Sequence, residues 1–99
     1  MSDLESTFAF QLRAVGIPFE QQFRIPGRRF RWDFKVGDYL IEIQGGIWMD
    51  KSGHNTGRAL KRDYEKANIA ALNGYHTLFF TSADITSGEA IRVIEGVRK

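Results

Sequence analysis

The chain has 99 residues, of which 42% are apolar and 13% aromatic, and its formal net charge is +2. This composition excludes a disordered chain, and the length predicts a single domain over residues 1–99. No apolar run approaches the roughly 18 residues that cross a membrane. The absence of cysteine excludes a disulfide scaffold and zinc–thiolate sites. Together with an acidic N-terminus that lacks a signal peptide, it favours a cytoplasmic location.

An amphipathic helix is predicted at the start of the chain. Ser2 and Glu5 have the spacing of a capping box, in which two side chains satisfy backbone N–H groups of the first turn. The apolar residues that recur at helical spacing are Leu4, Phe8, Leu12 and Val15. Gly16, followed by Pro18, is typical of a helix end.

Three strands are predicted next, and short turns make them an antiparallel meander. The first covers about residues 19–25, the second alternates from Phe30 to Lys35, and the third covers about residues 39–44. Gly37-Asp38 joins the last two, and its Gly-first order suits a two-residue type II′ turn.

The second strand alternates between aromatic and polar side chains. Successive strand residues point to opposite faces of a sheet, so the aromatic and polar rows are expected on different faces. The aromatic row is Phe30, Trp32 and Phe34, and the polar row is Arg31, Asp33 and Lys35. In the third strand, Leu40, Glu42 and Gln44 are expected on the face of Asp33.

The second half of the chain predicts a helix, a strand and a last helix. The first of these helices covers about residues 58–73, ends at Asn73-Gly74, and precedes a short buried strand over residues 76–80. Its expected buried stripe is Leu60, Tyr64, Ala67 and Ala71. Thr86 and Glu89 have capping-box spacing before the last helix, whose expected inward residues are Ala90, Ile91, Ile94 and Val97. The order αβββαβα predicts a three-layer α/β sandwich with helices on both faces of the sheet.

A glycine-containing segment separates the third strand from the second long helix. Segments of this length without regular structure are often functional in small domains. Lys51 and His54 are candidates for phosphate or water contacts. Trp48 either stacks on a base or caps the core, and His76, at the head of the fourth strand, is interpreted as structural.

The hairpin brings two acids together. If Val36 pairs with Tyr39, Asp33 falls opposite Glu42, with Cβ atoms about 5 Å apart. Two carboxylates that close repel each other unless a cation lies between them or one keeps its proton. Mg²⁺ takes oxygen ligands, often one or two carboxylates with waters and phosphate oxygens. Asp33, Glu42 and the backbone carbonyl of Ile43 are therefore candidate ligands. In the same register Arg31 falls opposite Gln44.

Two basic clusters flank the acid pair. Their members are Arg24, Arg28, Arg29, Arg31 and Lys35 in one, and Arg58, Lys61, Arg62 and Lys66 in the other. Such clusters are either solvated faces or a surface that binds phosphates. The residues that we interpret as DNA-binding are Arg28, Arg29, Arg31, Lys51, His54, Arg58 and Arg62.

The acids and their neighbours resemble the PD-(D/E)XK nucleases of the restriction-endonuclease-like fold. The resemblance lies in Asp33 on one strand and Glu42-Ile43-Gln44 on the next, and in the αβββαβ order. It extends over Gly45 to Trp48, Gly57-Arg58, Asp63-x-x-Lys66-x-Asn68 and Leu72 to Tyr75. The ensemble is similar to small phage-encoded and very-short-patch-repair-like members of that superfamily. It implies a central four-stranded mixed sheet flanked by helices. It also implies Mg²⁺-dependent cleavage of DNA that leaves a 5′-phosphate and a 3′-hydroxyl, with Mn²⁺ able to substitute.

The chain departs from the pattern of the superfamily in two places. Trp32 stands where the name-giving proline occurs, a harmless variation. Gln44 stands where the superfamily usually has a lysine that orients water and balances charge, and an amide supplies no positive charge. Lys66, one turn after Asp63 on the second long helix, is the natural substitute. Glu5 corresponds to an acidic residue that often joins the site, or it serves only the capping box.

We therefore expect a metal-dependent DNA endonuclease that recognises DNA shape or structure. Asp33, Glu42, Gln44, Lys66 and Glu5 are its predicted catalytic residues, and a homodimer is needed to cut both strands together. One alternative is a catalytically degenerate DNA-binding module on the same fold, which the change to Gln44 supports. Another is an RNA-cleaving nuclease. Asp63 is expected to hold Arg58 or Lys66 in place.

Overall fold

The computed structural model describes residues 3–44 and 56–97, without the side chains of residues 56–59. The elements in chain order are α1 (Asp3–Ala14), β1 (Glu20–Arg24), β2 (Arg31–Val36), β3 (Tyr39–Gln44), α2 (Thr56–Leu72), β4 (His76–Thr81), α3 (Ser82–Thr86) and α4 (Glu89–Val97). The predicted αβββαβα order is confirmed, and its last helical part consists of two helices. None of the helices in the described part is long and apolar enough to cross a membrane.

The strands form one mixed sheet in the order β1-β2-β3-β4. β1 and β2 are antiparallel, as are β2 and β3, which confirms the meander. β4 returns parallel to β3, from Tyr39↔His76 to Gln44↔Thr81, after the crossover through α2. The end of β3 that carries Glu42 and Gln44 therefore lies between β2, its antiparallel partner in the hairpin, and β4, its parallel neighbour.

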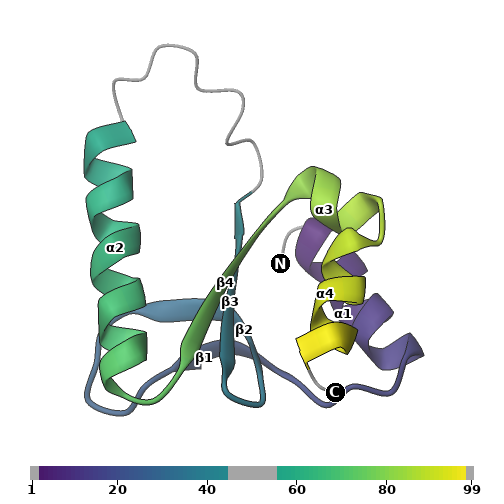
Figure 1. Ribbon diagram of the computed structural model, residues 1–99, viewed down its shortest axis with the longest axis horizontal. Helices are drawn as coiled ribbons and strands as arrows, with labels where there is room; N and C mark the ends of the chain where they lie inside the picture. The colour runs from purple at the N-terminus through teal and green to yellow at the C-terminus, as the bar shows by residue number, and fades with distance from the viewer. Residues whose placement is uncertain (1–2, 45–55, 98–99) are drawn as a thin grey trace.

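Helices cover the two faces of this sheet. Figure 1 shows α2 on one side and α1, α3 and α4 on the other. The larger core cluster belongs to the second side and includes Phe8, Leu12, Phe34, Val36, Ile41, Phe80, Ile85 and Ile94. The smaller cluster contains Ile25, Trp32, Leu40 and Ala70, the last from α2. The three-layer prediction is thus confirmed.

The hairpin turn has the predicted geometry. Val36 pairs with Tyr39 across it. Gly37 has a φ of 56°, a conformation that glycine adopts without a steric cost. Asp38 is not among the described residues of positive φ, as a type II′ turn requires. The turn residues therefore set the register of the two strands that carry the acids.

The alternation predicted for β2 is broken at Asp33. Phe34 packs in the larger cluster, whereas Trp32 packs in the smaller one on the α2 side, with Phe30 against it. A regular strand would place side chains two residues apart on one face. In β1, Gln22 has a φ of 54° and, like Asp33 in β2, is skipped in the ladder between the pairs Gln21↔Phe34 and Phe23↔Trp32. The prediction of one aromatic face was wrong, because both strands are distorted where the acid lies.

The buried stripe predicted for α2 was also wrong. Leu60 and Tyr64 are 45% and 63% exposed, and Ala71 is exposed. The helix instead turns Lys66 and Ala70 toward the sheet, and they are 7% and 0% exposed. Apolar periodicity could not indicate this face, because its central residue is a lysine that finds polar partners below the helix.

The C-terminal region begins one helix earlier than predicted. Thr81 caps α3 in a capping box with Asp84. The capping box predicted at Thr86 is replaced by a bond from the Glu89 N–H to Ser87 Oγ. In α4 Ala90 and Ile94 are buried as expected, whereas Val97 is exposed. Val15, predicted in the stripe of α1, lies past its end and is 43% exposed.

Candidate functional site

Asp33 and Glu42 meet at the point where the β2–β3 ladder opens. The paired residues of this ladder run from Val36↔Tyr39 to Phe34↔Ile41. Beyond them each acid accepts a hydrogen bond from the opposite strand. The backbone N–H of Asp33 donates to Glu42 Oε2 at 3.2 Å, and that of Ile43 donates to Asp33 Oδ2 at 2.8 Å. The two carboxylates therefore lie together, as the hairpin register predicts, and they bridge the strands in place of ladder bonds.

Lys66 reaches this pair from α2. Its Nζ donates to Glu42 Oε1 at 2.5 Å and to the backbone carbonyl of Arg31 at 2.6 Å. The ammonium also lies 5.1 Å from the centre of the Trp32 ring, within range of a cation–π interaction. The side chains of Lys66 and Glu42 are 8% and 16% exposed. A buried charge needs such partners, so the lysine beside the acids is held by several contacts.

The environment of Glu42 makes ionisation of its carboxyl harder than in a free glutamate, so its pKa is raised. Burial raises the pKa of this carboxyl, and the hydrogen bond and charge of Lys66 offset part of that effect. The negative charge of Asp33 raises the pKa of Glu42 further. A second cation at the acid pair would therefore stabilise the ionised form.

Gln44 is anchored to α2 through its amide. Gln44 Nε2 donates to Asp63 Oδ2 at 3.1 Å. Asp63 was expected to hold Arg58 or Lys66 instead. Among the described side chains, Lys66 forms its ion pair with Glu42. The side chain of Arg58 is not among those that the structure describes. The contact with Asp63 uses the amide nitrogen of Gln44 and not its amide oxygen, which is an acceptor.

Glu5 of α1 belongs to the surroundings of Asp33. Its Oε1 accepts a hydrogen bond of 2.9 Å from Gln22 Nε2. Burial raises the pKa of Glu5, and the charge of Asp33 raises it further, while that of Arg31 lowers it. Ser2, its predicted capping partner, lies outside the described residues. Sequence reasoning missed Gln22, because a polar residue on an edge strand carries no signal of this role.

The acid pair has the donor chemistry of a magnesium site. In residues 3–44 and 56–97, no group of three or more Asp, Glu or His side chains is arranged to hold an ion. Magnesium usually takes one or two carboxylates and completes its shell with water and phosphate oxygens. Each carboxylate has lone pairs beyond those that accept the backbone and lysine bonds. Asp33 and Glu42, with the carbonyl of Ile43 beside them, fit this ion.

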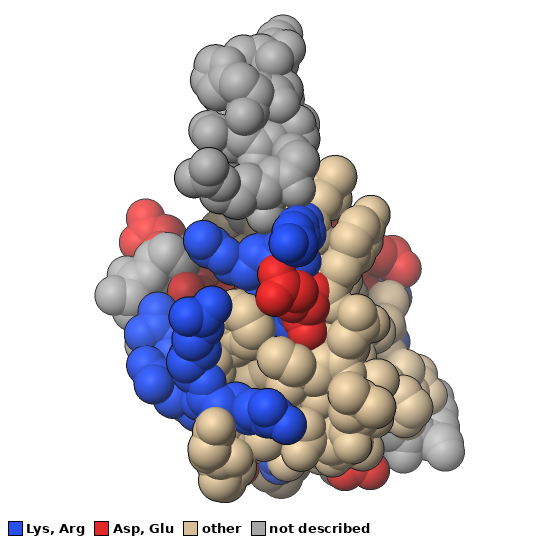
Figure 2. Space-filling view, turned by 90° about the vertical axis from the view of Figure 1, so that its left-hand side faces the viewer, with Lys and Arg blue, Asp and Glu red and all other residues tan. Residues whose placement is uncertain are grey.

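A basic groove adjoins the acid pair. It encloses about 550 Å³ and is lined by Arg24, Arg29, Phe30, Arg31, Arg62 and Lys66. Figure 2 shows how Lys and Arg gather along one side of this face of the molecule. Arg29, Arg31 and Arg62 were predicted to bind DNA, and Arg24 was not. Arg28, also predicted, does not line the groove, although it is exposed.

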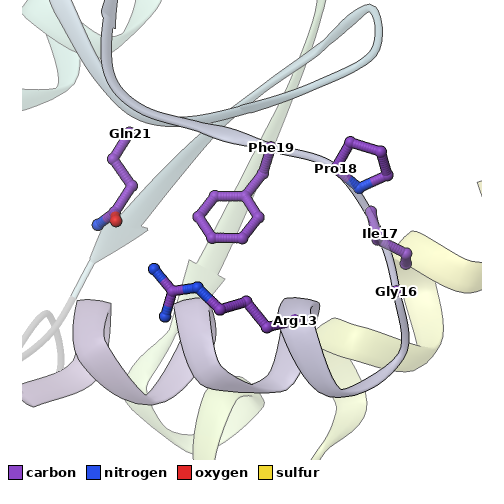
Figure 3. Close-up of a pocket in the computed structure, with 6 residues that line it drawn as sticks. All are labelled: Arg13, Gly16, Ile17, Pro18, Phe19 and Gln21. Carbon is purple, nitrogen blue, oxygen red and sulfur yellow. The ribbon is translucent and has the colours of Figure 1, made fainter.

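A second hollow lies at the connection between α1 and β1. It encloses about 620 Å³, and Figure 3 shows its lining, in which the Arg13 guanidinium lies 5.3 Å from the centre of the Phe19 ring. None of the predicted site residues whose side chains the structure describes lines it. Three predicted or weighed residues, Trp48, Lys51 and His54, lie outside the described part of the chain.

Comparison of the sequence with models of protein families and with curated proteins found no match. Among solved structures, the chain is similar to the catalytic domain of the homing endonuclease I-Bth0305I. The TM-score is 0.69 over 96% of this chain and 92% of that chain, with 18% sequence identity. The likeness confirms the α/β fold with its mixed sheet between helices, which is the fold of an endonuclease catalytic domain.

Proposed function

We propose that this domain is a metal-dependent endonuclease that hydrolyses phosphodiester bonds in DNA. The observation that carries the proposal is the contact of Lys66 Nζ with Glu42, beside Asp33. The superfamily that the sequence resembles needs two acids and a lysine, and the strand triplet here ends in Gln44. The buried lysine of α2 supplies the cation that the triplet lacks.

Asp33, Glu42 and the carbonyl of Ile43 would hold Mg²⁺ or Mn²⁺. The bound ion would activate water and stabilise negative charge on phosphate oxygens. Lys66 has three N–H donors, and its two hydrogen bonds leave one for a water or phosphate oxygen. Gln44, held by Asp63, would orient a water through its amide oxygen. Glu5 would act as an outer acid near Asp33.

A cleavage assay tests the proposal. Wild-type protein is incubated with plasmid, single-stranded, flap and junction DNA in Mg²⁺ or Mn²⁺. We expect cleavage that Asp33→Asn/Glu42→Gln abolishes and that Lys66→Met slows by about 100-fold or more, the usual cost of losing a group that stabilises charge. Asp38→Asn and Arg13→Met remove exposed charges of the same kind outside the site and should cut at the wild-type rate.

The second candidate function is a DNA-binding module without turnover. The neutral Gln44 favours it, since the triplet itself provides no cation. Binding that depends on salt, with no cleavage of any substrate in either metal, would establish this module and refute the nuclease. Cleavage of an RNA strand but not of the matching DNA would make the substrate RNA. A homodimer is proposed for cuts in both strands, and it predicts second-order dependence of linearisation on protein concentration.

A further inference from the structure

The basic groove places like charges directly against each other. Arg24 and Arg31 are partners across the β1–β2 ladder, and directly opposed like charges destabilise a sheet. Arg62 and Lys66, one turn apart on α2, line the same groove with Arg29. Five cations therefore share about 550 Å³, and no carboxylate among the described residues lines it.

These arginines have few partners among the residues that the structure describes. Arg24, Arg29, Arg31 and Arg62 are all exposed. Among the residues that the structure describes, none of the four forms an ion pair, and the lysine of the groove pairs with Glu42. Their mutual repulsion is relieved when an anion with more than one charge enters the groove. Consecutive phosphates of one nucleic-acid strand provide such an anion.

The groove also contains a stacking platform. The guanidinium of Arg29 lies 5.5 Å from the centre of the Phe30 ring, and Phe30 is itself fixed against the smaller core cluster. Planar arginine and aromatic side chains stack on unpaired bases, and a cationic groove with such a platform is typical of proteins that bind single strands. A base inside a duplex presents no free face to it.

We propose that this groove binds an unpaired nucleic-acid strand on one flank of the acid pair. The phosphates contact Arg24, Arg31 and Arg62, and a base stacks on Arg29. Lys66 joins the groove to the acids, because it lines the groove and donates to Glu42. That the groove lies beside a cleavage site rests on the proposed function. Under that function, the substrate is DNA with an unpaired segment.

Binding is measured without metal, so that it is independent of cleavage. Fluorescence anisotropy in EDTA compares strands of about 12 thymidines or 12 uridines with a blunt duplex of similar length, within the usual size of single-strand sites. We expect either strand to bind at least about fivefold more tightly than the duplex, the gain from one stacked base. Tighter binding of the duplex would overturn the proposal.

Matched variants assign the binding to the groove. Arg24→Ala/Arg62→Ala should weaken strand binding about tenfold and lower the slope of log K against log salt by about 1.4, since each contact with a single strand contributes about 0.7. Arg29→Lys keeps the charge, loses the stack and should cost about fivefold. Arg13→Ala removes an exposed arginine outside the groove and should change nothing. Equal affinity of the double variant and the wild type for the strand would refute the proposal that the strand binds in this groove.

The two proposals fail in different ways. If the strand binds through these arginines but no substrate is cleaved in Mg²⁺ or Mn²⁺, the nuclease proposal fails and the groove stands. If flap DNA is cleaved and Arg24→Ala/Arg62→Ala binds it as well as wild type does, the nuclease stands and the groove fails. Circular dichroism of each variant shows that the fold is retained.

Discussion

The ammonium of Lys66 is the one buried charge among the described side chains, and it depends on groups from two strands. Glu42 neutralises it, the Arg31 carbonyl accepts from it, and the Trp32 ring covers it. Removal of one partner from a buried ion pair leaves the other charge without compensation. The same lysine therefore contributes to stability as well as to the proposed chemistry.

Lys66→Met should lower the free energy of unfolding by about 3 kcal/mol in EDTA, because Glu42 is left buried without its cation. Lys66→Met/Glu42→Gln removes both charges and should recover part of the loss. Urea denaturation followed by circular dichroism measures both values. Lys61→Met, at an exposed position of the same helix, should stay within about 0.5 kcal/mol of wild type. A Lys66→Met variant as stable as that control would contradict the buried pair.

Glu5→Gln should raise the Tm at pH 8 in EDTA. Burial and Asp33 raise the pKa of Glu5, so its ionisation costs more in the folded state than in the unfolded state. That cost applies above the raised pKa, declines as the pH falls through it, and vanishes below the unfolded pKa, where both states are protonated. The difference in Tm from wild type should therefore disappear near pH 3–4. Glu95→Gln, on the exposed surface of α4, is the matched control for replacing a glutamate by glutamine.

At the scale of elements, the sequence predicted the β2–β3 hairpin but not the distortion of β1 and β2 beside it. Gly37-Asp38 and the positions of Asp33 and Glu42 follow from turn chemistry and strand period. The face of Trp32 does not, because Gln22 adopts a φ that only glycine favours. Lys66 could be predicted as the substitute for the missing lysine, because it lies one turn after Asp63 and has a long side chain. Its burial could not, since it depends on a carbonyl and a ring from a different element.

Gln22→Gly should leave stability unchanged or raise it by up to about 1 kcal/mol, because glycine occupies a positive φ without strain. Gln21→Gly, one residue earlier where φ is not positive, should cost about 0.5–1 kcal/mol, as glycine does in a regular strand. Thermal denaturation compares the Tm values of the two variants with that of the wild type. The Gln22 variant also loses the amide bond to Glu5, so we expect slower cleavage despite its stability. A large loss of stability would show that the amide, rather than strain, dominates this position.

At the scale of the whole molecule, a metal ion held by the acid pair would link metal binding to folding. An ion that binds only the folded state at about 100 times its Kd adds about 2.7 kcal/mol, which is about 10–20 °C in Tm for a domain of this size. We expect this rise in Mn²⁺ or Mg²⁺ for wild type and for Asp38→Asn, measured by differential scanning calorimetry. Asp33→Asn/Glu42→Gln should show none. A metal-dependent rise that persists in the double variant would place the ion elsewhere.

The helices that supply Glu5 and Lys66 cover opposite faces of the sheet (Figure 1). They lie on either side of the hairpin in the sequence, so the parts of the site are synthesised one after another. A ribosome makes the acid-bearing hairpin before it makes α2. A nascent chain that ends before Lys66 carries both acids but not the cation that neutralises one of them. Under the proposed function, such a chain would cut far more slowly than the complete one, even if its hairpin has formed. Full activity would begin only when the crossover helix has docked, so an incomplete copy would largely spare the nucleic acids around it.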